Sequence, residues 1–398
     1  MRRTVLNAAL DRATKVRRDP ERALAFWRVR AAAIIAASDT EPDTADMAFV
    51  DDLGHLLRSF ANVPDLTPIG WTVQLRNAEQ RLENRLRVKW IHTRNPLVGA
   101  EPVERPVFIV GLPRAATSLV HRILADSAPH RGPLLWELLR TGLDRDTASA
   151  ERSRRTVEKQ VARLTALAPD YAAIHPLRAD RPEESIAVMW RSYFPLSCAI
   201  MPDHRARLEQ ADLTADYAYL RQVLQVLQYG RERRRWILKF PGHVAHLDVI
   251  RQVFPDAAFV WTHRDPVAAV GSFCSLVEAL AGLHCKRIDP VQIGQTWLGL
   301  LADSIERGRK LRHALPSGTL ADVSYHRLVT DPHRYVPRLY EQLGAVWSNA
   351  DKAGLDVLTG GPERVSGHRY DLGRYGLRPD EVEAAFGDYR EQVADLRA

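Results

Sequence analysis

Residues 106–119 read PVFIVGLPRAATSL, an apolar run followed by a turn and the beginning of a helix. A short apolar run bounded by turn residues is typical of a buried strand, and Gly111 and Pro113 indicate the turn. A strand that leads through a turn into a helix directs the free N–H groups and the positive dipole end of that helix at one point. Such a point attracts phosphate, although an ordinary strand–helix turn capped by Thr117 explains the same residues.

A second segment of this kind follows about 150 residues later. Residues 259–266 read FVWTHRDP, an apolar strand that ends near Arg264, and Pro266 suits the first turn of a helix. Ser272 lies eight residues after the arginine, within that helix. An arginine can hold a phosphate through two hydrogen bonds and a serine hydroxyl can add another, whereas pairing of Arg264 with Asp265 is the alternative. Together the two segments predict a ligand that carries phosphate at two places.

Short apolar strands alternate with helices over most of the chain after Pro106. The predicted strands are residues 107–110, 236–239, 258–263 and 319–323. The helices that follow them are predicted at about 116–127, 242–254, 266–282 and 290–313. Such alternation is typical of an α/β fold with a central parallel sheet and right-handed crossovers.

The remaining segments are predicted to be mainly helical. Residues 1–100 form a helical N-terminal region, because apolar residues recur there at helical spacing and no strand pattern interrupts them. Residues 101–398 form the α/β domain, with a helical insertion at about 140–230 that can cover the site. A last helix is predicted at 379–396.

Composition limits the class of protein. The 398 residues carry a net charge of +7, and the basic residues are dispersed rather than gathered in a tail. The sequence lacks the basic stripe with interleaved aromatic residues that is typical of nucleic-acid binding. Three cysteines without CxxC spacing favour a reducing, cytoplasmic setting. We find no apolar core of a signal peptide and no apolar stretch of roughly 18 residues, so no membrane span is expected.

The loop is not a Walker A motif, because no lysine precedes the Ser/Thr residue. Residues 113–118 resemble instead the first signature of the sulfotransferases that use 3′-phosphoadenosine 5′-phosphosulfate (PAPS), from the bacterial branch of that family, at four of six positions. Arg264 and Ser272 match the spacing of the family's second signature. Further similar stretches are residues 134–138, 236–241 and 323–332, so that the resemblance covers roughly residues 90–398.

The resemblance implies a P-loop-like three-layer fold and a set of PAPS-binding residues. Arg264 and Ser272 would bind the 3′-phosphate, Tyr325 would contact the adenine, and Arg369 would lie in a late basic loop over the 3′-phosphate. The 5′-phosphosulfate would lie in the loop formed by Arg114, Ala115, Ala116, Thr117 and Ser118.

Two loop residues depart from the family pattern. Ala115 replaces a hydroxyl residue that usually donates to the phosphate, and Ala116 replaces a glycine. A lost donor weakens binding by about 0.5–3 kcal/mol, and alanine at positive φ costs roughly another 1 kcal/mol. Both departures predict a weakened loop.

Sulfuryl transfer needs a base, cations that neutralise developing charge, and in-line geometry. Glu137 is the predicted base, since its apolar neighbours can raise its pKa to a useful value. Lys239, at the end of a predicted strand, resembles the family's transition-state cation, and Arg114 shares the charge of the leaving phosphate. We see no aspartate cluster for Mg²⁺ and expect no metal; His243 and His246 have the spacing of a metal pair but no third ligand.

The sequence therefore predicts a sulfotransferase that moves a sulfuryl group from PAPS to a hydroxyl of a small-molecule acceptor. One alternative is another P-loop nucleotide-handling enzyme, such as a kinase, against which the missing GK[ST] motif counts. The other is a non-catalytic nucleotide-binding relative, for which Ala115 and Ala116 are the best support. The acceptor and the oligomeric state are not determined by the sequence.

Overall fold

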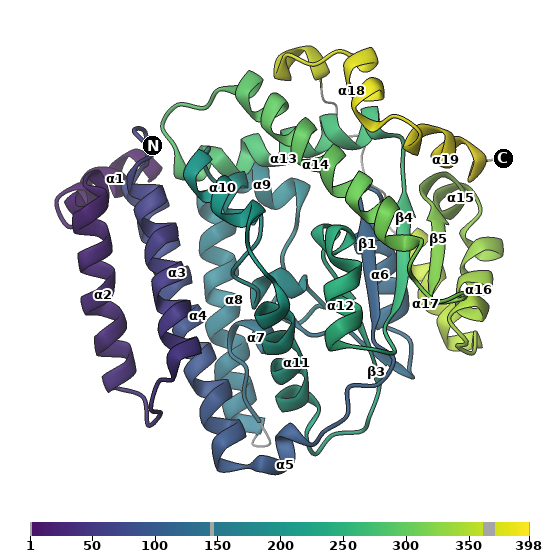
Figure 1. The fold of residues 1–398 in the computed structure, drawn as a ribbon, viewed down its shortest axis with the longest axis horizontal. Helices are drawn as coiled ribbons and strands as arrows, with labels where there is room; N and C mark the ends of the chain where they lie inside the picture. The colour runs from purple at the N-terminus through teal and green to yellow at the C-terminus, as the bar shows by residue number, and fades with distance from the viewer. Residues whose placement is uncertain (1, 144–146, 361–370, 398) are drawn as a thin grey trace.

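The computed structural model describes residues 2–143, 147–360 and 371–397. Its centre is a five-stranded parallel sheet, which confirms the predicted fold class (Figure 1). The strands lie in the order β2 (His130–Arg131), β3 (Arg235–Lys239), β1 (Val107–Gly111), β4 (Ala258–His263) and β5 (Leu320–Ser324). The strand β2 was not predicted, because two residues are too few to produce an apolar pattern.

Both faces of the sheet are covered by helices, so the domain has three layers. Alternate residues of a strand point to opposite faces. Val107 and Ile109 of β1 therefore share one apolar cluster with α6 (Thr117–Ala125), α16 (Pro332–Gln342) and α17 (Asn349–Gly360). Phe108 and Val110 belong to the larger cluster on the other face, with α11 (Thr214–Gln228), α12 (Leu247–Val253) and α14 (Pro290–Arg312).

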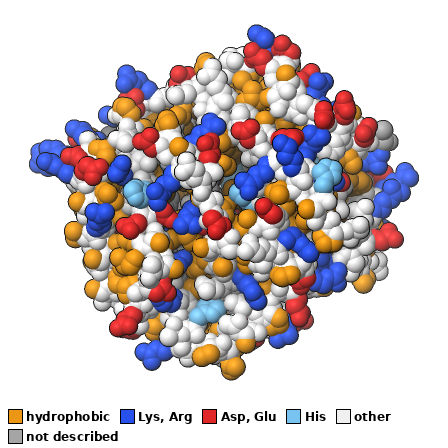
Figure 2. Space-filling view, in the orientation of Figure 1, with side chains coloured by type: hydrophobic (Ala, Val, Ile, Leu, Met, Phe, Trp, Pro, Cys, Tyr) orange, Lys and Arg blue, Asp and Glu red, His pale blue; other side chains and the backbone are white. Residues whose placement is uncertain are grey.

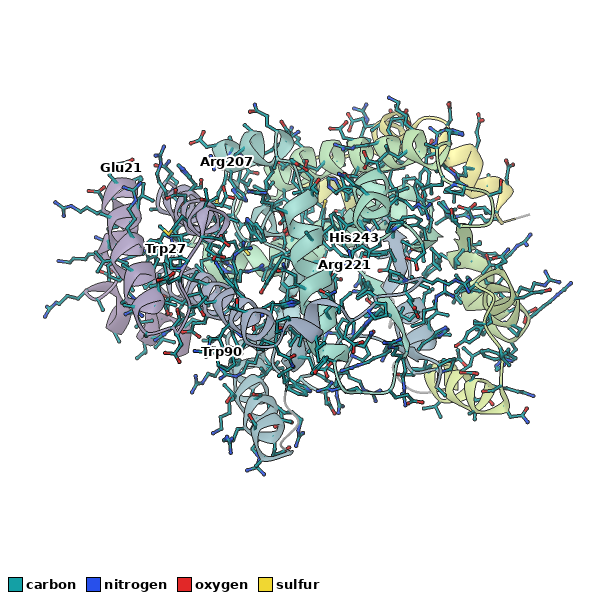
Figure 3. The ribbon with its side chains drawn as sticks, turned by 60° about the horizontal axis from the view of Figure 1, so that its bottom comes forward. Glu21, Trp27, Trp90, Arg207, Arg221 and His243 are labelled. Atoms are coloured by element: carbon teal, nitrogen blue, oxygen red, sulfur yellow. The ribbon has the colours of Figure 1, made fainter. Side chains whose placement is uncertain are left out.

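Helices occupy the N-terminal region, on the side of the molecule opposite β5 in Figure 1. They are α1 (Arg2–Asp11), α2 (Pro20–Ala36), α3 (Thr44–Ala61), α4 (Pro68–Arg94) and α5 (Pro96–Gly99). Asp19, Asp43 and Thr67 cap the N-termini of α2, α3 and α4 through their side chains, which explains where these helices begin. Trp27 of α2 is buried against this group, and Figure 3 places it far from His243 in the interior. The division into two domains stays a prediction.

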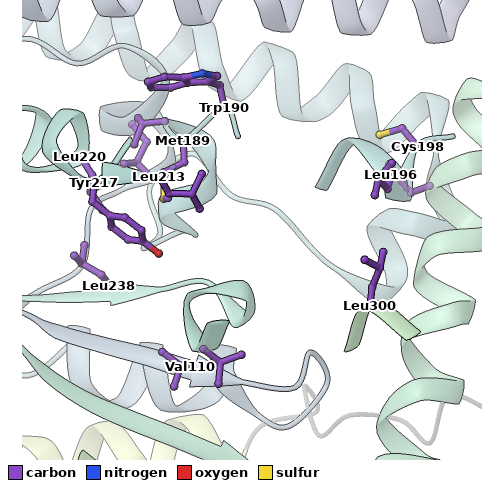
Figure 4. Packing of buried hydrophobic residues seen from close by; sticks show 14 of the residues in the cluster. Val110, Met189, Trp190, Leu196, Cys198, Leu213, Tyr217, Leu220, Leu238 and Leu300 are labelled. Atoms are coloured by element: carbon purple, nitrogen blue, oxygen red, sulfur yellow. The ribbon is translucent and has the colours of Figure 1, made fainter. Parts of the chain in front are cut away.

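The insertion between β2 and β3 is mostly helical and lies between the N-terminal helices and the sheet (Figure 1). It contains α7 (Leu135–Leu139), α8 (Thr147–Leu167), α9 (Pro169–Ile174), α10 (Pro202–Glu209) and α11. Short 3₁₀ helices occur in the chain at Lys15–Arg18, Ser185–Ala187 (η2), Phe194–Ser197, Pro241–His246 (η4) and Leu372–Tyr375. Figure 4 shows Tyr217 and Leu220 of α11 near Leu238 of β3, where the insertion packs on the sheet.

One described helix, α13 (Pro266–His284), is long and apolar enough to cross a membrane by length and composition alone. The prediction that no apolar stretch reaches this length was therefore wrong. The helix packs against α4, α9 and α14, and 56% of its most apolar window is buried. Burial on several sides explains its composition, and the absence of a membrane span stays a prediction.

Two helices follow Pro379 where the sequence predicted one. They are α18 (Pro379–Phe386) and α19 (Tyr389–Asp395), and Gly387 between them has φ +47°. A residue at positive φ ends a helix, and glycine adopts that conformation at little cost. The remaining helix, α15 (Tyr325–Thr330), begins directly at the end of β5.

Basic and acidic side chains are intermixed on the face seen in Figure 2. This distribution agrees with the dispersed charge in the sequence. A phosphate site must therefore be built from a few charged groups that the fold brings together.

Candidate functional site

The turn between β1 and α6 contains two non-glycine residues at positive φ, Arg114 at +68° and Ala116 at +64°. Few non-glycine residues adopt this conformation. Gly111 is also at positive φ, and a Cβ atom there would lie 2.4 Å from the Thr262 carbonyl oxygen, so only glycine fits where β1 passes β4. Ala116 is the N-cap of α6 and provides no side-chain hydrogen bond. The first turn of α6 therefore has no side-chain cap, as expected of a helix that receives an anion.

The side chains of the loop face different surroundings. Ala115 is fully buried in the apolar core, and its N–H donates to the Leu112 carbonyl oxygen at 3.3 Å. Thr117 is buried as well, whereas Ser118 is exposed. The expected loss of a phosphate donor at position 115 therefore has no geometric basis, because a hydroxyl there would lie in the core. The strain expected at Ala116 agrees with its positive φ.

Ala116→Gly should stabilise the protein by about 0.5–1 kcal/mol, because relief of the left-handed strain outweighs the greater flexibility of glycine in the unfolded chain. Urea midpoints of the two proteins measure this difference. Ala115→Gly is the matched control: this neighbour is buried and is not among the residues at positive φ, so it should lose stability. A fall in stability for Ala116→Gly would contradict the strained conformation.

The arginines of the two predicted segments meet beside this loop. Arg114 Nε donates to Ser272 Oγ at 3.2 Å, and Arg264 donates to the Arg114 carbonyl oxygen at 2.6 Å. The Arg264 guanidinium lies 4.3 Å from the centre of the Tyr325 ring. Burial lowers the pKa of Arg114, and the charge of Arg264 lowers it further.

No described carboxylate forms an ion pair with Arg114 or Arg264, although most other arginines of the described chain have one. Two neighbouring cations without a counter-charge are favourable only if an anion completes the group. The alternative, a pairing of Arg264 with Asp265, is not found among the described residues; Asp265 caps α13 and contacts Arg397 at 3.5 Å.

A second cationic group lies at the end of β3. The Lys239 side chain is 2% exposed, and its ammonium donates to Ser118 Oγ at 3.2 Å and to the Glu184 carboxylate. Because Ser118 is on the first turn of α6, this contact brings Lys239 to the helix N-terminus. The structure thus places Lys239 and Ser118 at the same edge of the sheet as Arg114 with its partners Arg264 and Ser272. This edge is formed by the carboxyl ends of β1, β3 and β4, where open α/β sheets bind ligands.

Glu183 and His175 lie next to the ion pair of Lys239 and Glu184. The His175 ring is 3.7 Å from the Glu183 carboxylate. Burial raises the pKa of Glu183, but the neighbouring His175 ring and the charge of Lys239 outweigh burial, so the net pKa is lowered. The side chains of His175, Glu183 and Glu184 offer metal-ligand atoms within 4.8 Å of one another. One of them is bound to Lys239, and the expectation of no metal stays a prediction.

Glu137 lies in a different cluster. Its buried carboxylate accepts from Arg131, from Arg231 at 2.9 Å and from the Leu134 N–H at 3.0 Å. Its hydrogen bonds and ion pairs with other described residues do not involve Lys239, Ser118 or Arg114. This arrangement supports a structural role, in which Glu137 caps α7 and neutralises two arginines.

The sequence analysis missed Glu184, Glu183 and His175. Residues 180–185 read DRPEES, which has no strand before it and no periodicity. The backbone brings the segment back through an isolated bridge between Leu134 and Pro182 and a hydrogen bond from Glu183 N to the Pro133 carbonyl oxygen. These contacts join residues about 50 positions apart and leave no local signal. Arg369, by contrast, lies outside the described residues.

One cavity of about 480 Å³ lies near the C-terminal end of α13, lined by Val277, Ala281 and residues of the N-terminal and insertion helices. Ala281 follows Ser272 by nine residues, which places it on the opposite side of the helix at 100° per residue. This cavity is therefore separate from the cationic groups at the sheet edge.

These features define an α/β protein with a cationic site at the carboxyl edge of its parallel sheet, beside the uncapped helix α6. Residues 106–349, more than half of the chain, match the model of the sulfotransferase family. The chain belongs to this family, as its loop and its Arg264–Ser272 pair indicated.

Individual relatives extend this result. The chain is 27% identical over 249 residues to the omega-hydroxy-beta-dihydromenaquinone-9 sulfotransferase Stf3 of Mycobacterium bovis and of Mycobacterium tuberculosis. The match covers 60% of this chain and 62% of each relative, so it spans less than two thirds of their length.

Two solved structures share the fold. Sulfotransferase STF1 from Mycobacterium tuberculosis H37Rv has a TM-score of 0.78 at 25% identity, over 90% of this chain and 98% of the other. STF9 from Mycobacterium avium has a TM-score of 0.77 at 24% identity, over 92% and 95% of the two chains. The likeness to STF9 shows the fold alone.

Proposed function

We propose that this protein transfers the sulfuryl group of PAPS to a hydroxyl group of a small-molecule acceptor. The observation that carries the proposal is the pairing of two cationic groups at one sheet edge. Arg114 and Arg264 lack a described carboxylate partner, and Lys239 reaches the uncapped first turn of α6 through Ser118. PAPS carries anionic groups at its 3′ and 5′ positions, and the protein offers cations at two neighbouring places of this edge.

The residues present fit this co-substrate. Arg264 and Ser272, which both contact Arg114, would hold the 3′-phosphate, and Tyr325 would lie beside the adenine. The first turn of α6, Ser118 and Arg114 would hold the 5′-phosphosulfate. Arg369 stays a predicted ligand of the 3′-phosphate.

PAPS supplies the activated sulfuryl group, and the protein supplies position, charge and a proton acceptor. The acceptor oxygen bonds to sulfur while the bond from sulfur to the 5′-phosphate oxygen breaks. Lys239 and Arg114 would neutralise the charge that grows on the leaving phosphate. The acceptor's proton needs a base at this edge of the sheet. We assign this role to Glu184, which contacts Lys239, rather than to Glu137, the base predicted from the sequence.

The acceptor is proposed to be an apolar alcohol. The relative Stf3 is named for a hydroxylated menaquinone derivative, and the helical insertion that covers the site packs through apolar residues. The proposed setting is the cytoplasm, supported by three free cysteines, of which Cys198 and Cys274 are buried.

Calorimetry with adenosine 3′,5′-bisphosphate, followed by transfer of labelled sulfuryl group to a panel of alcohols, tests this function. Binding with transfer, unaffected by a chelator, is the expected result. Binding without transfer to any acceptor would favour a non-catalytic nucleotide-binding protein. A requirement for Mg²⁺ would instead favour a kinase-like reaction.

Arg264→Ala should weaken binding of adenosine 3′,5′-bisphosphate by about 10- to 150-fold but leave the affinity for 5′-AMP nearly unchanged. A charge-assisted hydrogen bond is worth about 1.5–3 kcal/mol, and the proposed contact is to the 3′-phosphate alone. Ser272→Ala, which removes one neutral donor from the same group, should show the same preference with a smaller loss. Equal losses for both nucleotides would contradict the assignment of this group to the 3′-phosphate.

A further inference from the structure

A chain of three buried polar side chains lies directly behind Lys239. They are Tyr217 on α11, His243 in η4 and Ser185 in η2, and all three are fully buried. Tyr217 Oη lies 2.8 Å from His243 Nδ1, and Ser185 Oγ lies 2.7 Å from His243 Nε2. Ser185 Oγ is also 3.5 Å from the carbonyl oxygen of Lys239.

The hydrogen bonds of this chain have one consistent direction. A carbonyl oxygen only accepts, so the Ser185 hydroxyl donates to Lys239 O and must accept from His243 Nε2–H. The other ring nitrogen is then an acceptor, and it receives the Tyr217 hydroxyl proton. A neutral imidazole with one donor and one acceptor satisfies this order. Burial lowers the pKa of His243 well below its ordinary value, and His246 adds to the effect, which agrees with a neutral ring.

This arrangement connects three parts of the fold that are distant in sequence. Tyr217 and Ser185 come from different segments of the insertion, and Ser185 directly follows Glu184, whereas His243 follows the end of β3. Phe108 of β1 packs edge-on against the His243 ring at 5.2 Å, so the ring cannot turn freely. Two hydroxyl groups and an imidazole in a dry core are unfavourable unless they form hydrogen bonds with one another. Apolar side chains would fill the same space without this requirement, so packing alone does not explain these residues. Ser185 links them to the Lys239–Glu184 pair, because it directly follows Glu184 and contacts the Lys239 carbonyl oxygen.

We propose that Tyr217, His243 and Ser185 form a positioning network that fixes the carboxylate of Glu184 against the ammonium of Lys239. The network touches neither co-substrate nor acceptor; it acts by holding the segment 183–187 on the end of β3. The role in turnover rests on the proposed function, because Lys239 and Glu184 are the groups assigned to charge neutralisation and proton acceptance.

Tyr217→Phe and Ser185→Ala each remove one hydroxyl and test the network. Each variant should lower kcat about 10-fold while the KM for the acceptor and the affinity for adenosine 3′,5′-bisphosphate change less than about twofold. Groups that act as a unit are not additive, so the double variant should be no slower than the slower single one. Ser185→Thr, which keeps the hydroxyl, should retain most of the rate.

Tyr340→Phe is the matched control, since Tyr340 is an equally buried tyrosine whose hydroxyl donates to the Ile123 carbonyl oxygen at 3.0 Å. It removes the same atom outside the network and should leave kcat unchanged. Unchanged kcat in correctly folded Tyr217→Phe and Ser185→Ala proteins would overturn the proposal. Additive losses in the double variant, or a similar loss in Tyr340→Phe, would also overturn it, because either indicates a general packing effect.

Amide hydrogen exchange gives a measurement that is independent of activity. Ser185→Ala should raise exchange in a peptide covering residues 183–188, and Tyr340→Phe should not. If the native protein transfers no sulfuryl group, the proposed function fails, and the exchange result still decides whether the network holds this segment. Unaltered exchange in Ser185→Ala would show that it does not.

Discussion

Replacement of Lys239 by methionine should lower kcat by about two to three orders of magnitude. Methionine fills much of the same space but cannot neutralise the charge that grows on the leaving phosphate. The ammonium is buried and lies at the first turn of α6, where a charge is screened little by water. Arg114, the first turn of α6 and the residues proposed to bind the 3′-phosphate, Arg264 and Ser272, all remain. Adenosine 3′,5′-bisphosphate should therefore bind with a loss of about tenfold or less.

The half-buried Glu184 carboxylate is left without its cation in this variant, and a partly buried charge without a partner destabilises a protein. A second variant, Lys239→Met with Glu184→Gln, removes the stranded charge and should recover the melting temperature without recovering the rate. Single-turnover rates and melting temperatures from the same preparations separate the two effects. A single variant that retains more than about half of the native kcat would remove Lys239 from the chemistry.

The sheet could be predicted because its strands are buried on both faces. A strand such as β4 is then a continuous apolar run that ends in polar residues, and its predicted bounds, 258–263, match the structure. The strands β1, β3 and β5 agree within a residue at each end. The two turns of the candidate site follow from the same pattern, since they begin where these apolar runs end.

The carboxylates of the site could not be found in this way. Glu184 reaches Lys239 only because the insertion returns to the sheet through contacts between residues 133–134 and 182–183. Such a long-range contact leaves no periodicity in the sequence. The sequence also does not show where the side chain of Ala115 lies. Its position in the motif suggests a phosphate contact, but the side chain is buried in the core.

The apolar flanks of Glu137 suggested a base with a raised pKa, but the sequence gives no sign of the two arginines that meet there. Arg131 lies in β2, and Arg231 comes from the loop before β3, close to 100 residues away in sequence. Arg131 also stacks over the Trp236 ring at 4.8 Å, which orients its guanidinium toward the carboxylate. A buried carboxylate between two cations is costly to remove, and the motif alone does not distinguish it from a base.

Glu137→Gln should therefore lower the stability of the protein by about 3–5 kcal/mol, because it leaves Arg131 and Arg231 without their counter-charge. Turnover per folded molecule should change little. Glu184→Gln should differ in its effect on the reaction: it should lower kcat per folded molecule by about 10²–10⁴, as loss of a general base does. It should also lower stability, since it leaves the buried Lys239 ammonium without its counter-charge.

The two variants are a matched pair, because each changes one carboxylate oxygen to an amide nitrogen beside a cation. Rate, melting temperature and affinity for adenosine 3′,5′-bisphosphate should be measured below the melting temperature of the weaker protein, with the folded fraction determined for each. A Glu137→Gln protein that is fully stable but inactive would return the base to Glu137. A Glu184→Gln protein with native turnover would remove Glu184 from the reaction, and the lowered pKa of its neighbour Glu183 makes that residue a poor substitute, since a strongly acidic carboxyl has little affinity for the acceptor's proton.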